Sequence, residues 1–316
     1  MLDYRLVEAL AAVVLEGGFD RAARTLHLTQ PAVSQRVKAL EDALGVLLVV
    51  RSTPPRATAE GQRVLAHFLQ VEQLEQDLGR NLAPESDAEW ATLRIGVNAD
   101  SLATWFLAAI RPFLEEERVL LDLSVEDQDL THELLRDGRV AACLGSRAEP
   151  LQGCRRQALG RMDYLCLATP GFAARWFPEG LTAEAVQRAP AVVFNRKDRM
   201  HARFLAGLLG REIRFPAHYL PSSEQFLEMV AAGLAYGMTP ELQARPRLAA
   251  GELVDLAPGR TEAAALYWHT WGLRTRRLDR LTDQVVRAAR EVLAQGSAVS
   301  GQRASEGRGK AGSAAS

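Results

Sequence analysis

The sequence predicts an α/β protein that carries an N-terminal all-α winged helix-turn-helix and a larger half built from two Rossmann-like lobes. Two features predict this fold. Residues 19–45 contain two short helical patterns joined by a tight turn, and an apolar strand and a proline-rich turn follow them. From residue 93 onward, short apolar strands alternate with helical patterns, which is typical of parallel sheets covered by helices on both faces.

The opening stretch MLDYRLVEALAAVV has the pattern of an amphipathic helix, and the acids among its apolar residues argue against a signal peptide. The chain has 316 residues, 47% of them hydrophobic, which is enough for two or three packed units. No apolar run reaches the length of a membrane span. We therefore expect a cytoplasmic protein without membrane contact.

The second helix of the N-terminal pair is expected to begin near Gln30. Thr29 can accept a hydrogen bond from the free amides of the first turn, and Pro31 lies where its missing N–H costs nothing. The preceding helix offers Ala22 and Ala23, small residues that let two helices cross closely. The apolar face of the second helix recurs every three or four residues, as a core-facing stripe does, and comprises Val33, Val37, Leu40 and Leu44.

The opposite face of this helix carries polar side chains suited to DNA. Gln and Ser can hydrogen-bond base edges, whereas Lys and Arg mainly contact phosphates or guanine. An ordinary solvated helix face has a similar composition, so the helix alone leaves both interpretations open. The DNA-binding candidates are Thr29, Gln30, Pro31, Ser34, Gln35, Arg36 and Lys38 on the helix and Arg51 and Arg56 beyond it.

The segment after the helix favours DNA binding. Residues 47–51 form a short apolar run, SerThrProProArg turns the chain, and Ala57 and Thr58 lead into a new helix. This is the outline of a two-stranded wing. Its Arg51 and Arg56 would reach the neighbouring DNA backbone or minor groove.

The segment LHLTQPAVSQRVKALEDALGVLLVVRSTPPRATAEGQ resembles the winged helix-turn-helix of LysR-type transcriptional regulators. The shared features occur in order: the Thr-Gln-Pro that opens the helix, Ser34, the pair Leu40 and Glu41, the wing arginine, and a Thr-x-x-Gly at residues 58–61. Such an ordered match is far more specific than a helix-turn-helix alone. The resemblance implies a DNA-binding transcription factor and no enzyme.

The net charge of −1 is low for a DNA-binding protein. What matters is placement, and the bases of the predicted recognition helix and wing cluster at Arg36, Lys38, Arg51 and Arg56. Weak overall basicity implies modest non-specific affinity. Specific binding then depends on base contacts and on multiplying sites through oligomerisation.

Residues 59–82 predict one long helix that cannot cover its own apolar seam. Antiparallel pairing with a second subunit would cover it, and the resemblance implies the same homodimer, assembled further into a homotetramer. Two wings at a fixed separation require an inverted repeat in double-stranded promoter DNA. The seam comprises Val64, Phe68, Val71, Leu74, Leu78 and Leu82.

We divide the chain into four parts: a DNA-binding domain at 1–58, a dimerisation helix and hinge at 59–90, an effector-binding domain at 91–295, and a disordered Gly-, Ser- and Ala-rich tail at 296–316. Lobe I covers about 91–163 and 269–295, and lobe II about 164–268. The resemblance supports two lobes around a cleft, because LysR-type effector domains look like periplasmic binding proteins. Strand patterns occur at 93–97, 120–126, 140–144, 164–169 and 264–269, and helix patterns at 102–114, 130–137, 225–232 and 278–293.

Three polar helix starts mark the expected ligand site, because ligands of open α/β sheets lie beyond the carboxyl ends of the strands. Ordinary helix capping explains each set singly. Together, amide-rich helix starts suit an α-carboxylate and surplus acids suit a cation, so the complementary ligand is a basic amino acid. The effector-binding candidates are Asp100, Ser101 and Thr104, then Glu126, Asp127 and Asp129, then Ser222, Ser223 and Glu224.

Further segments resemble the ArgP or LysG branch of LysR-type regulators: VNADSLATW, VEDQ, SSE, GELVDLAPG and LYWH. Members of that branch sense lysine and arginine, in some cases histidine, and activate a basic amino-acid exporter gene through RNA polymerase. The resemblance thus implies L-lysine or L-arginine as effector and no cofactor or metal. Many LysR-type regulators carry Asp in the third strand where this chain has Ala141, which argues against a ligand contact there.

Alternatives stay open at this point. The chain could respond to a different metabolite, or be an architectural DNA-binding protein without an effector. Against an enzyme, we find no nucleophile elbow, zinc spacing or phosphate loop. The cysteines, Cys143, Cys154 and Cys166, lack metal-ligand spacing and are expected to be buried thiols, with a redox switch as the less favoured reading.

Overall fold

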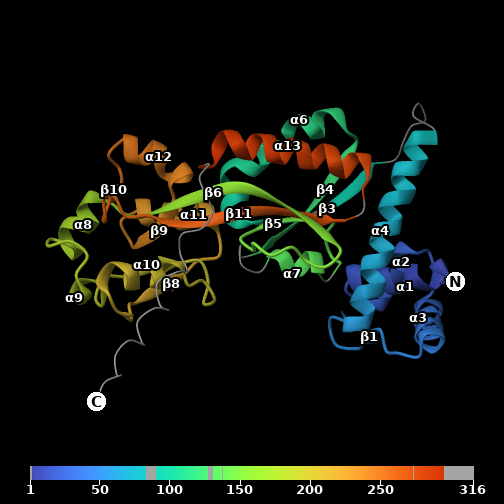
Figure 1. Cartoon of the computed structure of the whole chain (residues 1–316). Coiled ribbons are helices and arrows are strands. Elements are labelled where there is room, and N and C mark those ends of the chain that lie inside the picture. Colours follow the sequence, from blue (N-terminus) through green and yellow to red (C-terminus); the bar gives the residue numbers. More distant parts are fainter. Residues whose placement is uncertain (1, 83–89, 127–130, 137, 273, 295–316) are drawn as a thin grey trace, which may run out of the picture.

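The computed structural model describes residues 2–82, 90–126, 131–136, 138–272 and 274–294. A small helical head lies at one end of an elongated molecule, and the α/β half extends away from it (Figure 1). The predicted tail and most of the predicted hinge lie outside the described residues. Among the helices of the described ranges, none is both long enough and apolar enough to cross a membrane.

The head packs three helices around one core and adds a two-stranded wing. Val33, Val37 and Leu40 are buried in this core as predicted. Leu44 differs from the prediction and is 39% exposed, because it lies in the last turn, where Gly45 at φ 69° ends the helix. The elements are α1 (Tyr4–Leu15), α2 (Phe19–Thr25), α3 (Gln30–Leu44), β1 (Val49–Val50), β2 (Arg56–Ala57) and α4 (Ala59–Leu82).

Helix α4 is the predicted long helix, but its seam is divided between two environments. Val64 and Phe68 pack against the core of the head, so this end of the seam is covered within the chain. Leu74 is 41% and Leu78 58% exposed further along the helix. An unpaired stripe of this kind leaves the C-terminal half of α4 available to a partner.

One mixed sheet runs through both lobes, in the order β4-β3-β5-β11-β6-β9-β7-β8 with β10 paired to β6. Parallel strands form each lobe, as the alternating pattern predicts. Two long antiparallel strands, β6 and β11, cross between the lobes. The strands are β3 (Ala91–Asn98), β4 (Val119–Glu126), β5 (Ala142–Gly145), β6 (Cys154–Ala168), β7 (Ala191–Val193), β8 (Ala217–Tyr219), β9 (Tyr236–Pro240), β10 (Val254–Asp255) and β11 (Glu262–Trp271).

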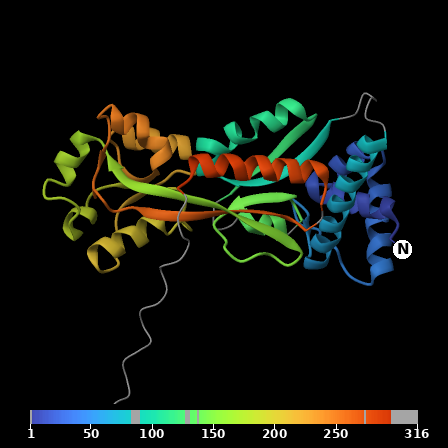
Figure 2. The same cartoon turned by 45° about the horizontal axis from the view of Figure 1, so that its top comes forward.

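The helices cover both faces of this sheet (Figure 2). The predicted helix at 102–114 is longer than expected, and a π-helical turn, η1 (Leu102–Phe106), interrupts it. Lobe I carries α5 (Ala99–Ser101), α6 (Leu107–Glu116), α7 (Thr131–Arg136) and α13 (Arg276–Val292). Lobe II carries α8 (Pro170–Trp176), α9 (Ala183–Val186), α10 (Met200–Leu209), α11 (Ser223–Ala231) and α12 (Glu241–Ala249).

Candidate functional site

The structure presents α3 as an exposed helix with a defined start. Thr29 caps it, and its hydroxyl oxygen accepts a hydrogen bond from the Ala32 amide at 3.4 Å. Gln30, Gln35 and Lys38 are exposed on the outer face. Two more of the predicted DNA contacts, Ser34 and Arg36, are half-buried, and Pro31 is exposed in the first turn.

Glu41 fixes the wing to the end of α3. Its Oε1 accepts hydrogen bonds from the backbone amides of Leu48 at 2.8 Å and Val49 at 3.2 Å. The carboxylate therefore satisfies two backbone amides where the wing begins and ties the wing to the helix. Between helix and wing lies a groove whose lining includes Ser34, Lys38, Asp42, Leu47, Val50 and Arg51.

The Thr-x-x-Gly pattern has a structural cause at the start of α4. The Thr58 hydroxyl donates to the Leu47 carbonyl at 2.8 Å and accepts from the Gly61 amide at 3.0 Å. A Cβ on Gly61 would lie 2.0 Å from the carbonyl oxygen of Leu48, so only glycine lets the wing strand pass this closely. The motif thus holds the chain that leads into the wing against the start of α4.

Both wing arginines are exposed. The Arg51 guanidinium lies 5.7 Å from the ring centroid of Phe19 on α2, within the range of a cation–π contact. This contact holds Arg51 at the base of the wing, while Arg56 lies on β2 at the other wing strand.

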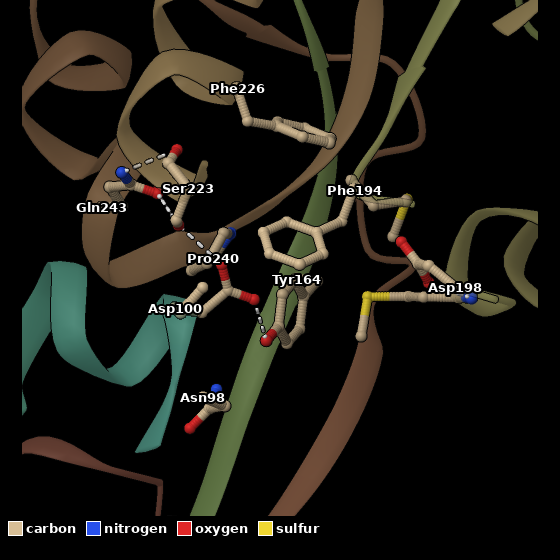
Figure 3. A pocket seen from close by; sticks show the side chains of 12 residues that line it. Asn98, Asp100, Tyr164, Phe194, Asp198, Ser223, Phe226, Pro240 and Gln243 are labelled. Carbon is tan, nitrogen blue, oxygen red and sulfur yellow. Dashed lines mark hydrogen bonds between the residues drawn. The ribbon is translucent and has the colours of Figure 1, made fainter. Parts of the chain in front are cut away.

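A second candidate site lies between the lobes, beyond the carboxyl end of β3. Figure 3 shows side chains from both lobes and from the crossing strand β6 converging on one pocket. Its lining comprises Asn98, Ala99, Asp100, Tyr164, Phe194, Asp198, Met200, Ser223, Phe226, Met238, Pro240 and Gln243. Among these described lining residues two are acids and none is Lys or Arg, so the pocket favours positive charge.

Asp100 connects the two lobes across this pocket. Its Oδ2 accepts a hydrogen bond from the Tyr164 hydroxyl at 2.7 Å, and its Oδ1 accepts one from the Ser223 hydroxyl at 2.6 Å (Figure 3). Gln243 Nε2 donates to the Ser223 carbonyl at 3.2 Å and steadies the start of α11. A carboxylate from lobe I is therefore held by hydroxyls of lobe II and the crossing strand.

Asn98 is 1% exposed, and neither its amide nitrogen nor its amide oxygen has a hydrogen-bond partner among the described residues. The Thr239 hydroxyl, on strand β9, is also buried and also has no hydrogen-bond partner among the described residues. Each such group costs about 1–3 kcal/mol when it stays unsatisfied. A ligand with both donors and acceptors would remove that cost at Asn98.

Asp198 is the second carboxylate of the pocket and comes from lobe II. Its Oδ1 accepts a hydrogen bond from the Met200 amide at 2.8 Å, which orients the side chain at the start of α10. Figure 3 places it across the pocket from Asp100, with the ring of Phe194 between them. An acid at each end and aromatic walls between suit an elongated cation.

The predicted effector residues are distributed around this pocket. Asp100 and Ser223 line it. Ser101 is buried in α5, Thr104 donates to the Asp100 carbonyl at 2.6 Å, Ser222 caps α11, and Glu224 is exposed beside it. Glu126 ends β4 in register with Asn98, and its side chain is not described; Asp127 and Asp129 lie outside the described residues.

Several lining residues carry no signal that sequence patterns detect. Tyr164 lies within β6 and Gln243 within α12, at positions indistinguishable from structural ones. Asp198 follows β7 in the turn sequence FNRKD, so the carboxyl-end rule applied to lobe II would have found it. Ala141 does not line the pocket but is buried in an apolar cluster on another side of lobe I.

The thiols are free and poorly suited to redox chemistry. Cys143 and Cys166 are buried, and burial raises the pKa of each thiol far above its usual value. Burial also raises the pKa of the half-buried Cys154. Protonated thiols react slowly, which favours the buried-thiol interpretation. Within the described ranges no group of three His, Cys, Asp or Glu is placed to hold a metal ion.

Two protein families match the chain. Residues 4–62 match the bacterial regulatory helix-turn-helix proteins of the lysR family. Residues 87–293 match the LysR substrate binding domain. The first match covers the head and the start of α4, and the second covers both lobes and the pocket.

Individual proteins are similar over nearly the whole length. The HTH-type transcriptional regulator ArgP of Pseudomonas aeruginosa is 48% identical over 291 residues, 92% of this chain and 96% of that protein. The crystal structure of ArgP from Mycobacterium tuberculosis superposes with a TM-score of 0.82 and 38% identity, over 94% of this chain and 100% of that one. Full-length LysG from Corynebacterium glutamicum, with its effector arginine bound, superposes with a TM-score of 0.74 and 34% identity. The match covers 93% of this chain and 100% of that one.

Proposed function

This chain belongs to the LysR family of bacterial transcriptional regulators, in its ArgP and LysG branch, and on that premise we propose that its interlobe pocket binds a free basic amino acid, L-arginine or L-lysine. The observation that carries the proposal is the charge of the pocket. Asp100 and Asp198 line it without any described base. Like its relatives, the chain is a DNA-binding regulator and not an enzyme.

The similarity to LysG supports the same ligand class. LysG is a LysR-type regulator whose structure holds arginine as effector, and it covers 93% of this chain. Arginine has a guanidinium that pairs with a carboxylate and an α-amino acid end that both donates and accepts hydrogen bonds. The buried amide of Asn98 offers one acceptor and one donor to that end.

We assign the two carboxylates different parts. Asp198 pairs with the ligand's side-chain cation, because it lines the pocket from lobe II, across from Asp100 and beyond the ring of Phe194. Asp100 already accepts two hydroxyl bonds, so it binds the ligand while it holds the lobes together. Glu126, the last residue of β4, and Asp127 and Asp129, which follow it in the sequence, remain predicted effector contacts.

We further propose how the chain binds DNA, assembles and controls transcription. The face of α3 with Gln30, Ser34 and Lys38 enters the major groove, and the wing arginines contact the flanking backbone. Two chains pair through α4 and two pairs form a tetramer on an inverted repeat. In the cytoplasm, ligand binding changes lobe closure and thereby the contact with RNA polymerase at the promoter of a basic amino-acid exporter gene.

Calorimetry on the purified full chain tests the ligand. Arginine and lysine should bind, whereas citrulline, which has nearly the shape of arginine without its charge, should bind at least tenfold more weakly. Asp198→Asn should weaken arginine binding by about tenfold or more, equivalent to ~1.4 kcal/mol.

Asp283→Asn, an exposed position on α13, is the matched control and should bind arginine as the unaltered protein does. Equal affinity for citrulline and arginine would refute a cation site. Absence of heat with lysine, arginine and histidine would favour a regulator of another metabolite or an architectural DNA-binding protein.

A further inference from the structure

Helix α4 packs against lobe I through an apolar cluster that joins the head to the effector-binding half. On α4, Leu65 is 1% and Leu69 3% exposed. They belong to one buried cluster with Leu134 of α7 and Trp271 of β11, together with Ala11, Leu135, Val140, Ala141 and Cys143. In Figure 2, α4 stands against the end of the α/β half, consistent with this contact.

Gly138 sets how closely the two parts approach. It follows α7 with φ 71°, and a Cβ placed on it would lie 2.4 Å from the Cβ of Ala66 and 2.8 Å from its backbone nitrogen. No side chain other than hydrogen fits between this turn and α4. Glycine is therefore required here twice, for its backbone conformation and for the approach of the helix.

Two ion pairs that share Arg94 lie between α4 and the strands of lobe I. Arg94 of β3 lies with its Nη1 3.4 Å from Glu72 Oε2 of α4, and its Nε lies 3.4 Å from Asp122 Oδ2 of β4. All three side chains are partly exposed, so the two ion pairs contribute orientation more than free energy. The contact thus has a fixed register along α4, between Leu65 and Glu72.

The same surface is in direct packing contact with the strand that leads to the pocket. A Cβ on Gly96 of β3 would lie 3.0 Å from Thr131 Cγ2 and 3.2 Å from Leu134 Cδ1 of α7. Gly96 precedes the pocket residue Asn98 by two positions on the same strand. Among the described residues, β3 thus packs against α7, and α7 and Gly138 pack against α4.

We propose that the face of lobe I formed by α7, the Gly138 turn and Trp271 is a docking surface for the chain's own helix α4, and that this joint transmits the state of the pocket to the DNA-binding head. The docking itself is independent of the ligand, whereas the transmission rests on the proposed function. Leu74 and Leu78 lie beyond the joint, so docking and pairing of two chains use different parts of α4.

The test places a wedge on α4 without altering the pocket or the recognition helix. Ala66→Leu keeps a strong helix former and pushes lobe I away from the Gly138 turn. Glu75→Leu adds the same side chain at an exposed position of the same helix and is the control. Gly138→Ala places a methyl group against α4 from the side of lobe I. Gly251→Ala is its control, because Gly251 also has a positive φ, 72°, and nothing lies within 4 Å of the added carbon.

Hydrogen exchange followed by mass spectrometry reports docking directly, without DNA or ligand. Ala66→Leu and Gly138→Ala should speed exchange in residues 131–141 at least tenfold, while the two controls leave these residues as protected as in the unaltered chain. Equal protection in Ala66→Leu and Glu75→Leu would overturn the docking surface, whatever the ligand proves to be.

The second arm measures transmission. Arginine affinity is taken from calorimetry, and DNA affinity with and without arginine from fluorescence anisotropy on a promoter fragment. Ala66→Leu should bind arginine within threefold of the unaltered chain, yet the arginine-dependent change in DNA affinity should shrink to within twofold of none. A full arginine effect in Ala66→Leu would overturn transmission through this joint, and loss of arginine binding in every variant would instead count against the proposed function.

Discussion

At the scale of single residues, His201 shows how burial determines charge. It is 2% exposed inside lobe II, and its ring lies 4.9 Å from the ring centroids of Phe215 and Tyr236. Burial lowers the pKa of the imidazole from 6.5 to about 4, partly offset by the backbone at Val192. The ring is therefore neutral in the folded protein at physiological pH.

Because the unfolded chain binds a proton below pH 6.5 and the folded chain does not until about pH 4, acid should destabilise the fold across that window. The loss at this residue should approach about 2 kcal/mol at pH 5 and about 3 kcal/mol near pH 4. Urea unfolding at pH 7.5 and pH 5 measures it. His201→Phe, which cannot titrate, should lose less stability than the unaltered chain, and an equal loss in both would contradict the assignment.

The residues that sequence patterns identify differ in kind from those they miss. Thr29, Glu41 and Thr58 act on backbone groups a few positions away or in the adjoining strand, so their motif spacing was visible in the chain. Asp100 and Ser223 follow the rule that ligands lie at helix starts beyond strands. Tyr164 enters the pocket only because β6 crosses between the lobes, a tertiary event without a local signature.

At the scale of elements, we expect the outer face of α3 to combine base reading by Gln30 and Ser34 with charge contacts by Lys38. Ser34→Ala or Gln30→Ala should reduce discrimination between operator sequences by about 1–3 kcal/mol for each lost base contact. Lys38→Ala should weaken binding to all DNA about equally and reduce the salt slope by about one. Anisotropy titrations on matched and scrambled fragments at several salt concentrations measure both quantities. Identical profiles for the two kinds of variant would contradict this division.

Helix α4 was predicted from its apolar period, yet the period could not show which part faces which partner. Val64 packs against the core of the head, Leu65 and Leu69 lie in the cluster with lobe I, Phe68 packs against both, and Leu74 and Leu78 are exposed. Periodicity identifies a buried face but not what buries it. Only the packed arrangement separates the three uses.

The exposed apolar residues near the C-terminal end of α4 lead us to predict that two chains associate there. Leu78→Glu should weaken self-association, because a charge would replace apolar surface at the proposed seam. Light scattering coupled to size-exclusion chromatography measures the mass. Leu234→Glu is the control, since Leu234 is 58% exposed, as Leu78 is, but lies in lobe II. If both variants elute at the mass of the unaltered protein, the seam lies elsewhere.

At the scale of the whole molecule, the lobes form one sheet that two crossing strands make continuous. The alternating pattern predicted the parallel strands and helices of each lobe. It did not reveal that β6 begins at Cys154, because the first half of this strand is largely exposed and polar. Asp100 then joins the lobes across the pocket through two hydroxyl partners, so we expect a ligand bound beside it to act on lobe closure.

A thermal-shift panel of the twenty amino acids on the full chain tests the claim that this pocket is built for a small cation. Ligand binding to the folded state alone stabilises it, by about 2.7 kcal/mol at one hundred times Kd. We expect arginine, lysine or histidine to raise the Tm, and neutral or acidic amino acids to leave the Tm unchanged. Equal stabilisation by leucine or glutamine, or by none of the twenty, would contradict the claim.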